Sequence, residues 1–261
     1  MPMKNRNTLT ILLCLSLFSC ASSQKKIEQA QEKDAQYQYN IGLFYLNSNN
    51  VDEAVRYFNK ALTLNSRHYQ SLNALGLAYS MRGNLQESIK LYQKCLGIAP
   101  NFTEAHNNLG TVYQEMGHID RAEEEFKKVI EDPNYTHKEL PYYNLARLYF
   151  SRQDFEKARL YVENAIRLNG RFALAFNLQG LILESQNNLY GAIESYKMAV
   201  KIVPDDVNFN FNLGAAYFKN DELRKAAEIL EKIAPQVTDV EMKEKLNSYL
   251  KAIKEKEKGA A

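Results

Sequence analysis

A unit of 34 residues recurs along most of this 261-residue chain, and its clearest copy is residues 103–136. The first half of that copy carries a small residue, Gly110, and an aromatic residue three positions later, Tyr113. After a turn at Gly117, the second half carries an apolar stripe at i, i+4 and i+7, formed by Ala122, Phe126 and Val129. Both halves have helical periodicity, so each unit is predicted to be a hairpin of two closely packed helices.

Six copies of this unit follow one another in register. The small residue of the first helix recurs at Gly42, Gly76, Gly110, Ala146, Gly180 and Gly214. The aromatic residue follows in five copies, and Leu183 replaces it in the fifth. The pattern resembles the tetratricopeptide repeat, which implies an all-α, right-handed superhelical solenoid of six helix hairpins. The predicted repeats are 35–68, 69–102, 103–136, 139–172, 173–206 and 207–240.

Residues 241–261 are predicted to form a capping helix with a charged tail. From Val240 to Lys258 one helix face is apolar, with Met242, Leu246, Tyr249, Leu250 and Ile253. A stack of repeats leaves its last apolar face uncovered, so a helix of this kind closes it. The alternative is an amphipathic helix that binds a partner.

The first nineteen residues are predicted to be a signal peptide. Lys4 and Arg6 precede an apolar run, residues 9–18, which is too short to span a bilayer. The ending Leu-Phe-Ser-Cys resembles the lipobox of bacterial lipoproteins, which implies that Cys20 becomes the acylated first residue. Cleavage near Ser19 to a soluble secreted form is the alternative.

Residues 20–34 are predicted to be the lipidated N-terminus and a polar tether. Beyond Ala21, Ile27 is the single aliphatic residue of 21–34 with a large side chain, and no stripe is available for burial. A frayed extension of the first helix fits equally well. Ala21 and Ser22 follow Cys20, and neither is acidic. This resembles lipoproteins that are sorted to the outer membrane.

Composition excludes several classes of function. Without the signal peptide the chain has 31 basic and 31 acidic residues, from totals of 33 and 31, so nucleic acid is not expected as a partner. The four histidines, His68, His106, His118 and His137, are scattered, and no Cys pair or Gly-rich phosphate loop occurs. We therefore expect no enzyme activity, metal, cofactor or small-molecule substrate. Cys95 is predicted to be a small core residue.

The joint between the third and fourth repeats is two residues longer than the others. It contains the sequence Glu-Asp-Pro-Asn-Tyr over residues 131–135, and Pro141 follows in the next helix. By itself this joint could simply bend the array. Together with the lipobox, the six repeats and Asn144, it resembles the PilW/PilF/Tgl group of type IV pilus lipoproteins. The helix from Ala146 to Tyr149 lacks the cysteine often seen in that group.

The first helices of such an array are expected to line a concave groove that binds segments of another protein. Asparagine recurs in this predicted face, and its amide can bond a peptide backbone, although some of these residues could instead cap turns. The predicted groove residues are Tyr39, Asn40, Leu43, Leu46, Asn73, Leu77, Met81, Asn107, Asn108, Thr111, Tyr143, Asn144, Arg147, Phe150, Asn177, Leu181, Phe211, Asn212, Ala215 and Phe218.

The resemblance implies a non-enzymatic lipoprotein on the periplasmic face of the outer membrane. Its partner would be the type IV pilus secretin, and its role that of a pilotin, which promotes the localisation and multimer assembly of the channel subunit. An alternative is a scaffolding lipoprotein that recruits cell-wall hydrolases or outer-membrane assembly factors. A third possibility, if Cys20 is not acylated, is an inner-membrane or soluble adaptor.

Overall fold

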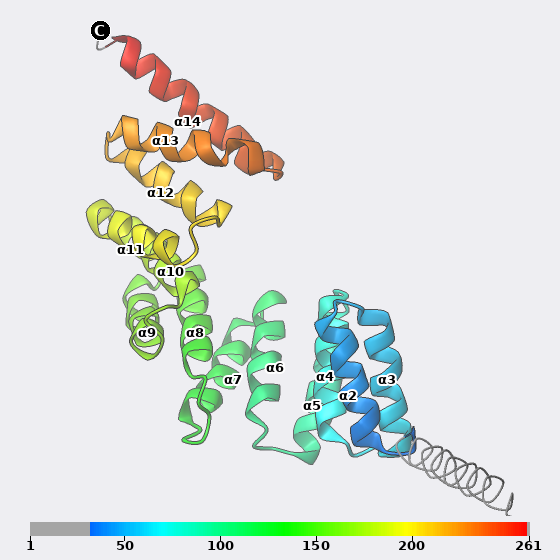
Figure 1. Cartoon of the computed structure of the whole chain (residues 1–261). Helices are drawn as coiled ribbons and strands as arrows, with labels where there is room; N and C mark the ends of the chain where they lie inside the picture. The colour runs from blue at the N-terminus through cyan, green and yellow to red at the C-terminus, as the bar shows by residue number, and fades with distance from the viewer. Residues whose placement is uncertain (1–31, 260–261) are drawn as a thin grey trace, which may run out of the picture. The chain divides into compact units, whose positions relative to one another are not determined.

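The computed structural model describes residues 32–259, and the signal peptide, Cys20 and the tether up to residue 31 lie outside this range. The described residues form thirteen α-helices and one short 3-10 helix, without a strand in this part of the chain (Figure 1). The predicted all-α class is therefore confirmed. The helices divide into two compact units, Met1–Met116 and Gly117–Ala261, which are described separately.

The first unit consists of two helix hairpins and one further helix. Its helices are α2 (Ala35–Asn47), α3 (Val51–Leu64), α4 (Tyr69–Met81), α5 (Leu85–Ile98) and α6 (Thr103–Glu115). Helix α2 packs against α3 and α4 against α5, and each hairpin then contacts the next helix along the chain. Consecutive pairing of this kind is typical of a helical repeat array.

The second unit continues the same pairing and ends with one longer helix. Its helices are α7 (Ile119–Glu131), α8 (Glu139–Ser151), α9 (Phe155–Leu168), α10 (Ala173–Ser185), α11 (Leu189–Ile202), α12 (Val207–Lys219), α13 (Leu223–Ile233) and α14 (Val240–Gly259). The 3-10 helix Ala234–Gln236 connects α13 to α14. Figure 1 shows the α10/α11 and α12/α13 pairs as neighbouring hairpins.

Small residues in the first helices give room for large rings in the second helices. A Cβ atom added at Gly42 would lie 2.5 Å from Phe58 Cε1, and one added at Gly76 would lie 2.8 Å from Tyr92 Cε1. Both rings are fully buried. The helices of a hairpin can therefore approach closely only because these positions carry no side chain.

The turn inside each hairpin places one residue in the left-handed region of backbone conformation. The values of φ are 75° at Gly83 and Gly117, and in the remaining hairpins they lie between 57° and 61° at Asn49, Gln153, Asn187 and Asp221. These six positions are spaced by 34 residues, except for the 36-residue step across the longer joint. The turn geometry is therefore repeated in every hairpin, even where glycine is absent.

The longer joint is tied to the helices on both sides of it. Lys138 Nζ donates to the carbonyl oxygen of Ile130 at the end of α7 (3.0 Å), and the backbone N–H of Asn134 donates to Asp132 Oδ1 (2.9 Å). The rings of Tyr135 and His137 pack edge to face. The joint thus begins with a turn closed by Asp132, and the Lys138 side chain satisfies an open carbonyl of α7.

Helix α14 covers the apolar end of the second unit. Leu246 and Ile253 are each 1 % exposed and join a buried cluster that includes Leu213, Leu230 and Ile233. These contacts place α14 where the sequence predicts a cap. Outside this apolar stripe, α14 carries many Lys and Glu residues, which keep its outer surface polar.

The thiol of Cys95 lies in the core of the first unit, as its sequence pattern predicts. The side chain is fully buried, and Sγ donates to the carbonyl oxygen of Tyr69 (3.2 Å). Burial raises the pKa of the Cys95 thiol to about 12. The reactive thiolate is consequently scarce in the folded protein.

We expect Cys95 to react at least about 100-fold more slowly with a thiol reagent in the folded chain than in urea, because folding removes both access and thiolate. The measurement is the rate of modification in a chain carrying Cys14→Ser and Cys20→Ser, so that a single thiol is counted. Equal rates with and without urea would contradict the buried position.

Candidate functional site

The inner helices of the first unit present an apolar stripe to solvent. On α4, Leu77 is 37 % exposed and Met81 is 50 % exposed. Leu43 and Leu46 on α2 are only half-buried but pack against the core of this unit. Leu77 and Met81 are therefore the predicted groove residues of this unit that offer the most apolar surface to a partner.

Two asparagines of the first unit are bonded to each other across neighbouring first helices. Asn108 Nδ2 on α6 donates to Asn73 Oδ1 on α4 (3.1 Å), and both side chains are half-buried. Asn40 on α2 instead accepts a hydrogen bond from Gln36 Nε2 (3.0 Å). The amides are thus held in place before any partner binds, which lowers the entropic cost of binding.

The second unit contains the same amide pair. Asn212 Nδ2 on α12 donates to Asn177 Oδ1 on α10 (2.8 Å), and these residues are also half-buried. In both pairs the donor and acceptor are 35 residues apart, one more than the repeat length. Each pair uses one N–H and one carbonyl oxygen, so further hydrogen-bonding capacity of the two amides is available for a peptide backbone.

The remaining predicted residues have mixed surroundings. Asn107 and Asn144 are half-buried, while Thr111 Oγ1 donates to the Asn107 carbonyl oxygen (3.0 Å). Tyr39 on α2 packs against Phe58 and His68. The other contacts are those of Arg147 with the ring of Tyr143, Tyr143 with Phe172, and Phe150 with Phe155.

Two predicted groove residues of helix α12, Phe211 and Phe218, also contact the capping helix α14. The rings of Phe211 and Phe218 lie 6.1 Å and 5.0 Å from the ring of Tyr249 on α14. Leu181 packs against the same cluster, and Ala215 is buried. These half-buried aromatic side chains therefore pack beside Tyr249 of the capping helix, which covers the last hairpin in place of a further repeat.

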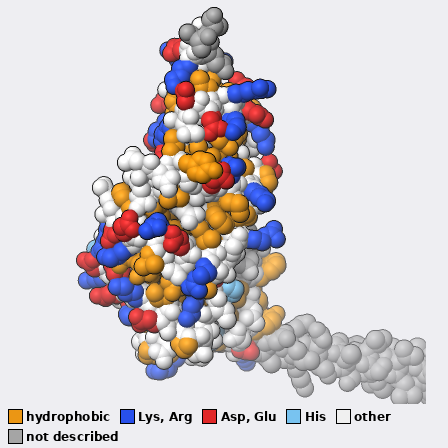
Figure 2. Space-filling view, turned by 90° about the vertical axis from the view of Figure 1, so that its left-hand side faces the viewer, with side chains coloured by type: hydrophobic (Ala, Val, Ile, Leu, Met, Phe, Trp, Pro, Cys, Tyr) orange, Lys and Arg blue, Asp and Glu red, His pale blue; other side chains and the backbone are white. Residues whose placement is uncertain are grey.

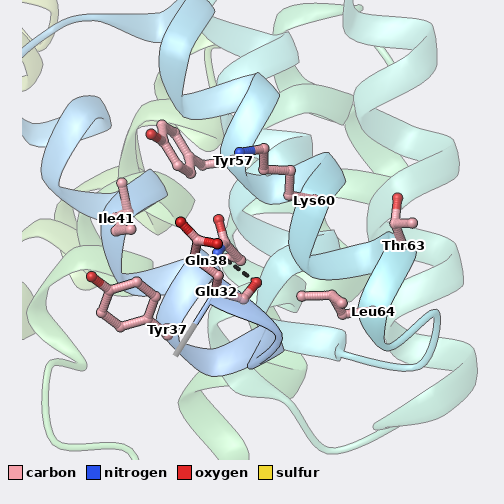
Figure 3. Close-up of a pocket in the computed structure, with 8 residues that line it drawn as sticks. All are labelled: Glu32, Tyr37, Gln38, Ile41, Tyr57, Lys60, Thr63 and Leu64. Atoms are coloured by element: carbon pink, nitrogen blue, oxygen red, sulfur yellow. Dashed lines mark hydrogen bonds between the residues drawn. The ribbon is translucent and has the colours of Figure 1, made fainter. Parts of the chain in front are cut away.

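A pocket of about 560 Å³ lies at the edge of the first hairpin (Figure 3). We name it the edge pocket. Its lining residues come from α2, from α3 and from the residue Glu32 that precedes them, and they are Glu32, Tyr37, Gln38, Ile41, Tyr57, Lys60, Thr63 and Leu64. This pocket combines apolar walls with polar groups, which is typical of a binding site.

His68 joins α2 to the start of α4. Its Nδ1 accepts the backbone N–H of Ser71 (3.3 Å) and lies 2.8 Å from Ser71 Oγ, while Nε2 lies 3.2 Å from Gln36 Oε1. These partners require a neutral ring with the proton on Nε2. Loss of water around the buried ring lowers the pKa of His68, although Asp34 opposes this shift.

We expect the first unit to lose stability as pH falls below about 6.5, the ordinary pKa of histidine, because the unfolded chain then binds the proton more readily than the folded one. The contribution of His68 is complete above this pH and disappears towards its lowered folded pKa. Urea unfolding at pH 7.5 and 5.5 measures the loss, which should be smaller in His68→Asn. An equal loss in both proteins would contradict the role of His68.

Another histidine also has a structural hydrogen bond. His106 Nε2 donates to the carbonyl oxygen of Pro100 (2.8 Å), which precedes α6. The residues that the structure describes contain no group of three or more His, Cys, Asp or Glu side chains suited to a metal ion. In the same part of the chain, no helix has the length and apolar content needed to cross a bilayer.

Surface charges of both signs are mixed. Figure 2 shows Lys, Arg, Asp and Glu side chains interspersed on the face that it draws, with hydrophobic side chains between them. Among the ion pairs of the described residues, Arg152 and Glu123 join neighbouring hairpins (2.8 Å), and Lys256 of α14 pairs with Asp221 in the turn of the last hairpin (2.7 Å). Mixed charge of this kind does not favour the phosphate backbone of nucleic acids, which requires clustered basic residues.

Sequence reasoning missed the edge pocket and the pairing of the asparagines. The pocket depends on how residues of α2 and α3 pack beside Glu32, and no local motif encodes that. The pairing has a signal in the sequence, namely the 35-residue interval between Asn73 and Asn108 and between Asn177 and Asn212. A search for amides at the repeat length plus one would have found both pairs.

Comparison with known families agrees with this architecture. Models of the tetratricopeptide repeat match residues 33–101, 79–135 and 141–172, and a TPR repeat model matches residues 180–221. Together these matches extend over well more than half of the sequence. The chain therefore belongs to the tetratricopeptide-repeat proteins, a family whose members typically act as protein-interaction scaffolds.

Solved structures share the fold at low sequence identity. PilF of Pseudomonas aeruginosa is 16 % identical with a TM-score of 0.74, and the match covers 84 % of this chain and 99 % of PilF. PilW, a widely conserved type IV pilus biogenesis factor, is 14 % identical with a TM-score of 0.75, covering 81 % and 97 %. YrrB, a TPR protein with an unusual peptide-binding site, is 20 % identical with a TM-score of 0.54, covering 73 % and 97 %.

Proposed function

We propose that this protein is a non-enzymatic, lipid-anchored assembly factor of type IV pili that binds the secretin subunit and acts as its pilotin. The likeness in fold to PilF and PilW supports this proposal most directly, because it extends over nearly the whole length of both proteins. The lipobox-like sequence ending at Cys20 supports an anchor in the outer membrane, facing the periplasm. An anchor would raise the effective concentration of a captured subunit at the membrane.

The chemistry of the first unit fits the capture of a peptide segment. Leu77 and Met81 offer apolar surface, and the pair formed by Asn73 and Asn108 lies one to two helical turns away along the same first helices. Apolar side chains of a partner would pack on the former, while its backbone could bond the latter. Recognition through the backbone requires no particular partner sequence, which suits a subunit that is captured before it is fully assembled.

We expect a strain without this gene to lose secretin multimers from its outer-membrane fraction while retaining the monomer. Complementation with the wild-type gene should restore the multimers, but complementation with Leu77→Asp and Met81→Asp together should leave at least about a tenfold deficit, since a charge in an apolar contact readily costs 1.4 kcal/mol. The measurement is a gel of secretin multimers and monomers. Both changed side chains are exposed, so the variant should fold.

Leu160→Asp is the matched control, because Leu160 is an exposed leucine, 57 % accessible, on the second helix α9. This variant should complement as well as the wild type. Unchanged multimers in the deletion strain would contradict the pilotin role and would favour a scaffold for other envelope proteins. Full rescue by the double variant would instead show that Leu77 and Met81 on α4 are not needed to recognise the secretin.

A further inference from the structure

One charged side chain on the first helices of the second unit has no partner of opposite charge. Helices α8, α10 and α12 carry four charged residues, which are Glu139, Arg147, Glu184 and Lys219. Glu184 pairs with Lys219, and Glu139 Oε1 lies 3.4 Å from His137 Nδ1 at the start of α8. Among the described residues, the guanidinium of Arg147 forms neither an ion pair nor a hydrogen bond. Its positive charge is therefore available to a partner.

The Arg147 side chain is exposed and lies over an aromatic ring. Its Cζ is 5.8 Å from the centroid of the Tyr143 ring, which is about one turn earlier on α8. Tyr143 is half-buried, and its ring packs against Phe172 at the start of α10, with 5.1 Å between the ring centroids. Burial raises the pKa of the Tyr143 hydroxyl, although Arg147 opposes this shift, so the hydroxyl stays neutral. The ring thus holds the guanidinium in place without cancelling its charge.

Two exposed leucines lie near this charge. Leu140 precedes Arg147 by seven residues, which places both side chains on one face of α8, about 10 Å apart along the helix. Leu174 occupies the same repeat position on α10, and α10 contacts α8. The two leucines are 42 % and 47 % exposed. We name Leu140, Tyr143, Arg147 and Leu174 the arginine face, because it combines apolar surface with one positive charge.

The charge is particular to the fourth repeat. Arg147 directly follows the small residue of its first helix, and no charged residue has this place in the other five repeats. The residues found there are Leu43, Leu77, Thr111, Leu181 and Ala215. The asparagines of the first helices can bond a peptide backbone whatever its side chains are, whereas a guanidinium attracts acidic segments and repels basic ones. Arg147 therefore adds a selection by charge that backbone recognition does not provide.

The neighbouring amides indicate which kind of carboxylate is bound. Asn144 lies on α8 beside Arg147, and Asn177 lies on α10, where it is bonded to Asn212 on α12 (2.8 Å). A side-chain carboxylate at Arg147 leaves the partner backbone free to continue along these amides on both sides of the contact. A C-terminal carboxylate would end the chain at this point. The arrangement therefore favours an acidic side chain within a segment.

We propose that the arginine face binds a protein segment in which an Asp or Glu lies about three residues from a large apolar residue. The carboxylate pairs with Arg147, and the apolar side chain packs against Leu140 and Leu174. An extended chain rises about 3.3 Å per residue, so about three residues span the distance between the two contacts. This inference rests on the proposed capture of a partner segment by the first helices, and it specifies the chemistry of that segment.

Selection from a random peptide library tests the proposal without assuming a particular partner. The full-length protein is immobilised, and the peptides are fused to their carrier at the C-terminus, so that their side chains supply every carboxylate. We expect an acidic residue about three positions from Leu, Ile, Phe or Met at least about threefold more often than in the unselected library. Arg147→Glu should select Lys or Arg in place of the acid, because like charges repel.

Arg224→Glu is the matched control, because Arg224 is an exposed arginine of the same unit on the second helix α13. This variant should select the same peptides as the wild type. Arg147→Lys should keep the preference for acids, since it retains the positive charge. The helical circular dichroism signal checks that each variant is folded.

One selected peptide, acetylated and amidated at its ends, then measures the contact itself. Replacing its acidic residue by the corresponding amide should weaken binding to the wild type at least about threefold and should leave binding to Arg147→Gln unchanged. A loss of equal size in both proteins would overturn the proposal, because the acid would then act elsewhere. A peptide that binds only with a free C-terminal carboxylate would overturn it as well.

The selection also has outcomes that would refute the arginine face. These are the absence of any selected peptide, selected peptides without a preference for acids, and the same acidic peptides selected by Arg147→Glu. None of these outcomes involves the secretin. Loss of secretin multimers in the deletion strain would still support the pilotin role if the arginine face failed, and an acidic preference would still stand if the pilotin role failed.

Discussion

Gly180→Ala is expected to destabilise the second unit by about 1 to 3 kcal/mol, the usual cost of inserting a methyl group into a packed core. A Cβ atom at this position would overlap the buried ring of Tyr196. The ring cannot move away freely, because Tyr196 OH donates to Glu184 Oε2 (3.0 Å). The free energy of unfolding in urea measures the loss.

The control is Gly97→Ala, because nothing lies within 4 Å of a Cβ atom built at Gly97 in helix α5. Relief of glycine's entropic cost should make this variant equally stable or more stable, by up to about 1 kcal/mol. In the fourth repeat the same pair of positions holds Ala146 and Val162, both fully buried. Adding Tyr196→Val to Gly180→Ala should therefore recover part of the loss, and strict additivity of the two changes would contradict the steric explanation.

Leu246→Ala is expected to cost about 2 to 5 kcal/mol, as for other fully buried leucines. The side chain is 1 % exposed and belongs to the cluster that joins α14 to α12 and α13. Its loss would leave a cavity beneath the capping helix, so we expect the second unit to unfold at lower urea concentration. The measurement is the helical circular dichroism signal across a urea titration.

Asn247→Ala, one residue further along α14, is the control for helix propensity and is exposed. It should leave the midpoint unchanged or raise it slightly. If the two alanine variants unfolded together, α14 would not be a cap of the second unit. If only Leu246→Ala lost stability, the apolar stripe predicted from the sequence would have its structural role established by measurement.

The spacing of small and aromatic residues was sufficient to predict the fold class. Gly42 and Phe58 illustrate the reason, since close helix packing requires an absent side chain opposite a large one, and both requirements are visible in the sequence. The turn residues were less apparent, because Gln153 and Asp221 adopt left-handed backbone conformations without being glycine. Their conformation is imposed by the helices on either side.

The candidate site was predicted less completely. Leu77 and Met81 are exposed on α4, but Phe211 and Phe218 pack beside α14, because an end effect is not encoded in the repeat itself. Gln179 directly precedes Gly180, at a position where the neighbouring repeats carry Leu145 and Leu213, and it accepts a hydrogen bond from Ser195 Oγ (3.1 Å). A polar residue was therefore accommodated by a partner on the second helix, which a survey of apolar positions alone does not consider.

The paired asparagines also set how far a unit can flex. The bonds from Asn108 to Asn73 and from Asn212 to Asn177 each connect the first helices of two adjacent repeats. Spreading two adjacent repeats on this side would break that bond, at a cost of about 1 kcal/mol. Each bond thus holds two neighbouring first helices together on the side of the predicted groove, so a partner segment bound there would meet amides that are already positioned.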